Sequence, residues 1–270
     1  MQSKIPTILY GTAWKEDQTE ELVRKAIAVG FRAIDTANQR RHYYEAAVGN
    51  AIAPMLKNGM KREELFIQTK FTFANGHDHR IPYDSNAKYT KQVQQSFQSS
   101  LEHLQTSYLD SYILHGPLQY GINDADLEVW GAMEVLQKEG KTKYIGLSNV
   151  DLHQLKEFYS AAKIKPKFVQ NRCFAQQQWD KQVRMFCAEH DILYQGFSLL
   201  TANTFFFPQF KYIAQKHNKT AAQVVFKFAM QAGMIPITGT TKEGHMKEDL
   251  TLDFELNKEE LQLIENIAVH

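Results

Sequence analysis

The chain has 270 residues, of which 43% are hydrophobic and 23% are charged, and its formal net charge is +1. This composition supports a large buried core and excludes a mainly disordered chain, and the balanced charge gives no reason to expect a nucleic-acid or membrane partner. The two cysteines are too few for a disulfide framework, and residues 1–9 lack the long apolar core of a secretory signal, so we expect a cytoplasmic protein.

Strand-like and helical patterns alternate along the whole chain. Short apolar runs predict eight strands, near Ile8–Gly11, Ala33–Asp35, Leu65–Thr69, Ser111–Leu114, Tyr144–Leu147, Phe168–Val169, Ile192–Tyr194 and Ile235–Ile237. Helical spacing follows each run, with capping patterns that begin at Thr19, Asp151 and Thr220. Because strands that alternate with helices form parallel sheets, eight such units predict a single-domain (β/α)8 TIM barrel over residues 1–270. A doubly wound open sheet is the alternative, but no G-x-G-x-x-G motif follows the first strand.

Polar side chains stand where several of these predicted strands end. Asp35, Lys70 and His115 each follow an apolar run, as do the pairs Ser148-Asn149 and Gln170-Asn171. Each residue considered by itself has a simpler explanation. An Asp at a strand end is often a helix cap, a Lys there is often a solvated surface charge, and a His there is often a turn residue. All strands of a parallel barrel end on the same face, where active sites are built. The coincidence of three such residues therefore predicts an active site.

Five segments, in this order and at this spacing, resemble the signatures of the aldo-keto reductase family. They are Ile34-Asp35-Thr36-Ala37, Phe66 to Lys70, Leu109 to His115, Gly146-Leu147-Ser148-Asn149 and Ile235 to Thr240. The resemblance implies an enzyme that reduces aldehydes or ketones to alcohols with hydride from a nicotinamide cofactor.

The resemblance also implies a catalytic tetrad of Asp, Tyr, Lys and His. Asp35, Lys70 and His115 match it directly. The loop before the next helix is about two residues longer than the family pattern, which leaves Tyr43 as the candidate tyrosine and Tyr44 as its alternative. The tyrosine would donate a proton to the substrate oxygen, and Lys70 would lower its pKa from about 10. Asp35 would keep Lys70 charged, and His115 would orient the substrate.

The cofactor site is implied by the same resemblance. The expected cofactor-binding residues are Ser148, Asn149, Gln170, Phe197, Ser198, Leu200, Thr240, Thr241, Lys242, His245, Glu248 and Asp249. His245 stands where the family often has an arginine for a 2′-phosphate, so NADPH is expected and NADH is the alternative. Trp14, Tyr44 and Phe71 are expected to line the substrate pocket. No spacing of ligands predicts a metal site.

We expect a small-molecule carbonyl compound as the partner, no nucleic acid or membrane, and a monomer or weak homo-oligomer. Two other functions stay open. A Schiff-base aldolase on the same barrel would use Lys70 as nucleophile. A cofactor-binding regulatory protein of this fold, with little or no turnover, would explain the altered tyrosine loop.

Overall fold

In the computed structural model, which describes residues 5–268, eight parallel strands close into a barrel in chain order. The strands are β1 (Leu9–Gly11), β2 (Ala33–Asp35), β3 (Phe66–Phe71), β4 (Leu109–Leu114), β5 (Thr142–Ser148), β6 (Phe168–Arg172), β7 (Leu193–Phe197) and β8 (Met234–Thr238). The barrel closes where β1 pairs with β8, with Leu9 opposite Ile237. This confirms the predicted (β/α)8 barrel.

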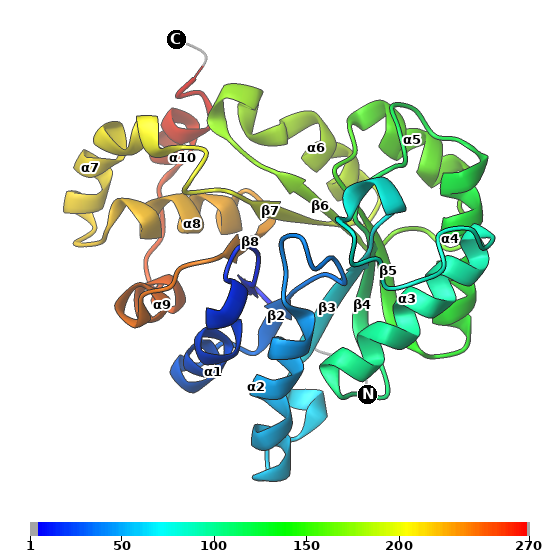
Figure 1. Cartoon of the computed structure of the whole chain (residues 1–270). Coiled ribbons are helices and arrows are strands. Elements are labelled where there is room, and N and C mark those ends of the chain that lie inside the picture. The colour runs from blue at the N-terminus through cyan, green and yellow to red at the C-terminus, as the bar shows by residue number, and fades with distance from the viewer. Residues whose placement is uncertain (1–4, 269–270) are drawn as a thin grey trace.

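Helices surround the strands, as Figure 1 shows. They are α1 (Thr19–Val29), α2 (Glu45–Lys57), α3 (Tyr89–Leu104), α4 (Asp124–Lys138), α5 (Leu152–Ala161), α6 (Lys181–Glu189), α7 (Phe207–Lys216), α8 (Ala221–Gln231), α9 (Glu243–Leu250) and α10 (Lys258–Glu265). Two helices, α7 and α8, separate β7 from β8. None of the helices in residues 5–268 is both long and apolar enough to cross a membrane.

The apolar core has two layers. Side chains such as Leu9, Phe66, Ile113 and Phe168 form a small cluster of their own. A larger cluster packs the helices against the strands, and Tyr10, Ile67 and Tyr112 belong to it. Tyr10 follows Leu9 and Ile67 follows Phe66, so neighbouring residues of a strand belong to different clusters, as the alternation of side chains requires.

The same alternation corrects one prediction about the pocket. Strand β3 extends two residues beyond its predicted end, to Phe71. Lys70 therefore points to the inner face and Phe71 to the outer face. Phe71 is fully buried against the rings of Phe73 and Tyr83. It belongs to the core between strand and loop, and the prediction that it lines the substrate pocket is wrong.

The helix starts are mostly as predicted. Asp151 and Thr220 each accept a hydrogen bond from the backbone N–H three residues later, which completes a capping box. Thr19 is already helical, and its hydroxyl donates to the Glu16 carbonyl, so its prediction as a cap is wrong.

The approach of α2 to α3 depends on Gly49. A Cβ at this position would lie 1.9 Å from the His103 carbonyl oxygen. Gly49→Ala should therefore lower the free energy of unfolding by about 3 kcal/mol, because helix backbone has to move. Gly131→Ala is the control, since the space around Gly131 in α4 is open and alanine stabilises a helix by about 0.5–1 kcal/mol. Urea unfolding of both variants measures the difference, and equal stabilities would contradict the close packing.

Candidate active site

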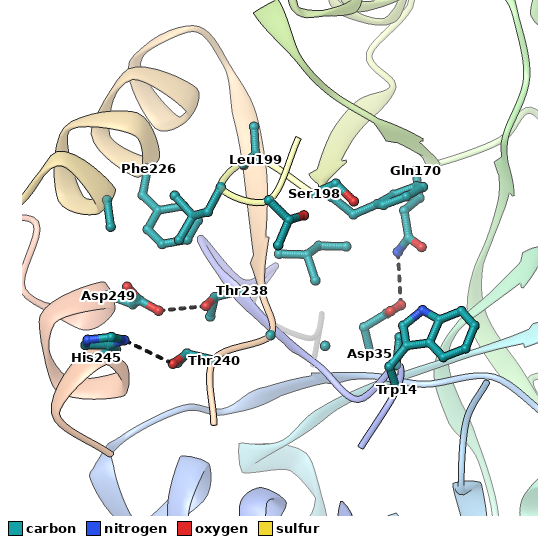
Figure 2. A pocket seen from close by; sticks show the side chains of 18 of the residues that line it. Trp14, Asp35, Gln170, Ser198, Leu199, Phe226, Thr238, Thr240, His245 and Asp249 are labelled. Carbon is teal, nitrogen blue, oxygen red and sulfur yellow. Dashed lines mark hydrogen bonds between the residues drawn. The ribbon is translucent and has the colours of Figure 1, made fainter. Parts of the chain in front are cut away.

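A cavity of about 730 Å³ lies beside the barrel's carboxyl-terminal end and extends between α8 and α9. Its lining comes from the ends of six strands, β1, β2, β5, β6, β7 and β8, from loops that include the one after β4, and from helices α7, α8 and α9. Figure 2 shows Trp14, Asp35 and Gln170 at one end, and Thr240, His245 and Asp249 at the other. The cavity is therefore elongated and has two chemically different ends.

A buried ion pair lies at the base of the first end. Lys70 Nζ is 2.8 Å from both carboxylate oxygens of Asp35 and 2.7 Å from the Thr36 carbonyl oxygen. Lys70 is fully buried. Burial lowers the pKa of Lys70, and the charge and hydrogen bonds of Asp35 oppose that effect. Asp35 therefore favours the charged form of Lys70, as predicted.

Glutamine side chains complete the hydrogen bonding of this ion pair. Gln68 and Gln170 donate through Nε2 to the same oxygen of Asp35, over 2.7 and 2.9 Å. Both also donate to Gln195 Oε1, and Gln195 donates back to Gln68. These side chains come from β3, β6 and β7. A polar layer thus lies inside the barrel, where apolar layers are usual. Gln68 and Gln195 were missed, although polar residues within apolar strands were the available signal.

Tyr43 lies over this ion pair and lines the cavity. Lys70 Nζ is 5.1 Å from the centre of the Tyr43 ring, and the His115 ring packs edge-on at 5.8 Å. Burial raises the pKa of Tyr43, and the charge of Asp35 raises it further. Burial is the larger cause of this shift, and a lowering of the Tyr43 pKa by Lys70 stays a prediction.

His115 lines the same part of the cavity. Its Nδ1 lies 2.7 Å from the Thr72 hydroxyl. Burial lowers the pKa of His115 well below its usual value, and the positive charge of Lys70 adds to this effect. The imidazole is therefore neutral near pH 7. Asp35, Tyr43, Lys70 and His115, far apart in the sequence, are together in space.

Polar groups from β5 and β6 form the next part of the wall. Ser148 Oγ donates to the Gln170 carbonyl oxygen, and Asn149 Nδ2 donates to the His115 carbonyl oxygen. Asn149 has a φ of 55°. Trp14 and Ser198, which also line the cavity, have φ values of 61° and 58°. Residues other than glycine seldom adopt such angles, and they cluster at functional sites.

The far end of the cavity carries carboxylates and hydroxyls. Thr238 Oγ1 donates to Asp249 over 2.6 Å, and burial raises the pKa of Asp249 to about 6. The Thr240 hydroxyl lies 3.5 Å from His245 Nδ1, as Figure 2 shows. Phe197, Ser198 and Leu200 also line the cavity, as does Glu248, which directly precedes Asp249 in α9. Leu199, Phe207 and Phe226 also line the cavity and were not predicted.

Five predicted residues lie outside this lining: Lys70 and Phe71, described above, and three more. Tyr44 lines only a smaller cavity, whose wall Tyr43 shares, and the Arg40 guanidinium is 4.0 Å from the Tyr44 ring centre. It precedes the first residue of α2, and its side chain does not follow that of Tyr43 into the main cavity. Thr241 and Lys242 are exposed in the turn before α9, where their side chains face solvent. Thr241 and Lys242, which were predicted to contact the cofactor, therefore do not line the cavity.

A buried lysine was missed altogether. Lys15 Nζ donates to the Gly239 carbonyl oxygen over 2.6 Å and lies 5.2 Å from the centre of the Tyr10 ring. Gly239 lines the cavity. Burial lowers the pKa of Lys15 to about 8. Nothing in the polar sequence around Lys15 distinguishes it from a surface lysine, so only the fold brings it to Gly239, behind the cavity wall.

Comparison with known proteins identifies the family. The model of the aldo/keto reductase family matches residues 7–269. Glyoxal reductase of Bacillus subtilis is 33% identical over 92% of this chain and 83% of its own length. NADP-dependent D-sorbitol-6-phosphate dehydrogenase of Malus domestica is 31% identical over 98% and 91%. The crystal structure of an aldo/keto reductase from Brucella melitensis has a TM-score of 0.82 at 30% identity, over 97% of this chain and 95% of that one. The chain belongs to the aldo-keto reductase family.

The cost of burying Lys15 can be measured through pH. Its pKa is about 8 in the fold, against roughly 10.4 in an unfolded chain. Because the unfolded chain binds the proton more tightly, charging Lys15 opposes folding most strongly below pH 8, and this cost decreases toward pH 10. Lys15→Met should raise the free energy of unfolding by about 1–2 kcal/mol at pH 7, since the lost hydrogen bond offsets part of the gain. Thermal unfolding should show this gain shrinking between pH 8 and pH 10. A gain that does not change with pH would contradict the assignment.

Proposed function

We propose that this protein is an NADPH-dependent reductase that converts aldehydes or ketones to alcohols. The observation that supports this most strongly is the arrangement around Tyr43. Its ring lies above the buried Lys70–Asp35 pair and against His115, in the wall of a cavity large enough for an extended ligand. Membership of the aldo-keto reductase family and the names of its relatives support the same class of reaction.

The residues present fit a nicotinamide cofactor. Gln170 donates through Nε2 to Asp35, which leaves its Oε1 to accept a hydrogen bond from a carboxamide, and Ser148 and Asn149 are next to it. Phe197 supplies an apolar face. The bound cofactor would supply the hydride that reduces the carbonyl carbon. At the far end, Thr240, His245 and the nearby Lys15 would hold phosphate groups, and Glu248 and Asp249 would face the adenine.

The chain's own residues would supply the proton. At neutral pH Tyr43 is protonated, as an ordinary tyrosine with a pKa of about 10 is, and burial raises its pKa further. As negative charge grows on the carbonyl oxygen, that oxygen becomes a much stronger base than a phenolate, and Tyr43 Oη can transfer its proton. Lys70 would stabilise the resulting tyrosinate, while Asp35 keeps Lys70 in place. His115 would donate a hydrogen bond to the same oxygen.

The structure disfavours the two other functions. Lys70 is fully buried, bonded to Asp35 and Thr36, and absent from the cavity lining, so it has no access to a substrate carbonyl as a Schiff-base nucleophile. A regulatory protein without turnover was suggested by the altered tyrosine loop. Tyr43 nevertheless lines the cavity beside His115, which supports turnover.

The preferred substrates are expected to be small aldehydes. Trp14 lines the cavity, is 71% exposed, and its ring lies 4.0 Å from the His42 ring at a tilt of 37°, so this part of the wall is aromatic and open to solvent. One relative is a glyoxal reductase, which supports dicarbonyl compounds as the first to test. A cytoplasmic location and a monomeric or weakly oligomeric state are part of the same proposal.

The two neighbouring tyrosines give a direct test of the mechanism. Tyr43→Phe should lower kcat for methylglyoxal reduction by about 10²–10⁴-fold, because it removes the proton donor. Tyr44→Phe is the matched control, since Tyr44 lies in the other cavity, and it should change kcat less than threefold. NADPH absorbance measures both rates, and circular dichroism checks the fold. The proposal fails if Tyr44→Phe is the inactive variant, or if the wild type binds NADPH but reduces no aldehyde in a broad panel.

Cofactor preference depends on positive charge near Gly239. NADPH should bind more tightly than NADH, and Lys15→Met should weaken NADPH binding about tenfold by removing a charged hydrogen-bond donor. Lys242→Met is the control, because Lys242 is exposed outside the cavity wall. Quenching of intrinsic fluorescence on titration gives each Kd. The proposal would be contradicted if the wild type bound NADPH and NADH with equal Kd, or if Lys242→Met raised the Kd for NADPH more than Lys15→Met does.

A further inference from the structure

The hydrogen-bond partner of His115 is supplied by the end of β3. Thr72 follows Phe71, the last residue of that strand, and its hydroxyl lies 2.7 Å from His115 Nδ1. Thr72 is buried, and His115 is the only described partner of its hydroxyl. The other ring nitrogen of His115, Nε2, is thereby left for a ligand in the cavity that His115 lines.

The direction of this hydrogen bond decides what His115 can do. Near pH 7 His115 is neutral, so one ring nitrogen carries a proton and the other accepts. If the Thr72 hydroxyl donates to Nδ1, Nε2 carries the proton and can donate to an oxygen that gains negative charge. If the hydroxyl accepts from Nδ1–H, Nε2 has a lone pair that repels such an oxygen. Only the first arrangement assists reduction of a carbonyl.

The loop after β3 holds Thr72 in place. The Thr72 carbonyl oxygen accepts hydrogen bonds from His77 Nε2 at 3.1 Å and from the Tyr83 hydroxyl at 2.7 Å. Gly76 packs so closely that a Cβ there would lie 2.6 Å from Thr72 Cγ2. The Gly76 carbonyl oxygen in turn accepts from Gln39 Nε2, which joins this loop to the one that carries Tyr43. A residue held on both its backbone and its side chain has a fixed orientation toward His115.

We propose that Thr72 is a positioning residue that donates its hydroxyl hydrogen to His115 Nδ1 and so fixes the His115 ring in the tautomer protonated at Nε2. This inference rests on the proposed reductase function and deepens it, since it names the group that makes His115 a donor toward the substrate oxygen.

Two substitutions separate the hydroxyl from the packing of Thr72. Thr72→Val keeps the shape and removes the donor, whereas Thr72→Ser keeps the donor and removes the methyl group that packs near Gly76. Thr72→Val should lower kcat for an aldehyde about tenfold to a hundredfold, with an unchanged Kd for NADPH. Thr72→Ser should retain at least a third of the wild-type kcat. Thermal unfolding of both variants checks that the loop is intact.

The tautomer can be observed without catalysis. In protein labelled with 15N-histidine, two-dimensional NMR distinguishes Nδ1–H from Nε2–H rings, and the spectrum of His115→Gln assigns the signal. The wild type and Thr72→Ser should show His115 protonated at Nε2, and Thr72→Val should show a mixture or the other tautomer. Protonation at Nδ1 in the wild type, or an unchanged tautomer and kcat in Thr72→Val, would overturn the proposal. If the wild type reduces no aldehyde, the function fails, while the NMR result still decides the role of Thr72.

Discussion

The candidate site depends on one interaction, the buried ion pair between Lys70 and Asp35. Two charges inside a barrel are costly to remove from water, and the cost is offset only when each has nearby polar partners. Here Lys70 binds both oxygens of Asp35 and the Thr36 carbonyl, while Gln68 and Gln170 donate to Asp35. The pair is thus fully hydrogen-bonded, and the Tyr43 ring lies over it, 5.1 Å from Lys70 Nζ.

This polar layer links the closure of the barrel to the geometry of the site. Asp35 comes from β2, Lys70 from β3, Gln170 from β6 and Gln195 from β7, so the network spans strands on both sides of the barrel. The strands cannot shift in register without breaking it. The cavity wall is built on the same strand ends, and the loop that carries Tyr43 is held to the β3 loop through Gln39. Rigid strands therefore support groups that a mobile loop alone would place less accurately.

The sequence predicted most of the fold because the signals were local. Eight apolar runs with helical segments between them are short-range patterns, and the residues that end those runs pointed to one face of the barrel. What the sequence could not predict depends on direction and distance. Phe71 was assigned to the pocket because the strand was predicted to end two residues early, which hid the alternation. Lys15 resembles any surface lysine until β8 places Gly239 beside it. The pKa of Tyr43 depends on the burial of its ring and on its distance from the charge of Asp35, and only the folded structure contains both.

The central claim is that Asp35 and Lys70 act as a unit that supports proton donation by Tyr43, and a double-mutant cycle tests it most directly. The rate of NADPH oxidation in a single turnover would be measured for Asp35→Asn, Lys70→Met and the combined variant. Groups that act as a unit give strongly non-additive effects. The account predicts that the double variant is hardly slower than the slower single variant. Losses that multiply, as for independent residues, would contradict it.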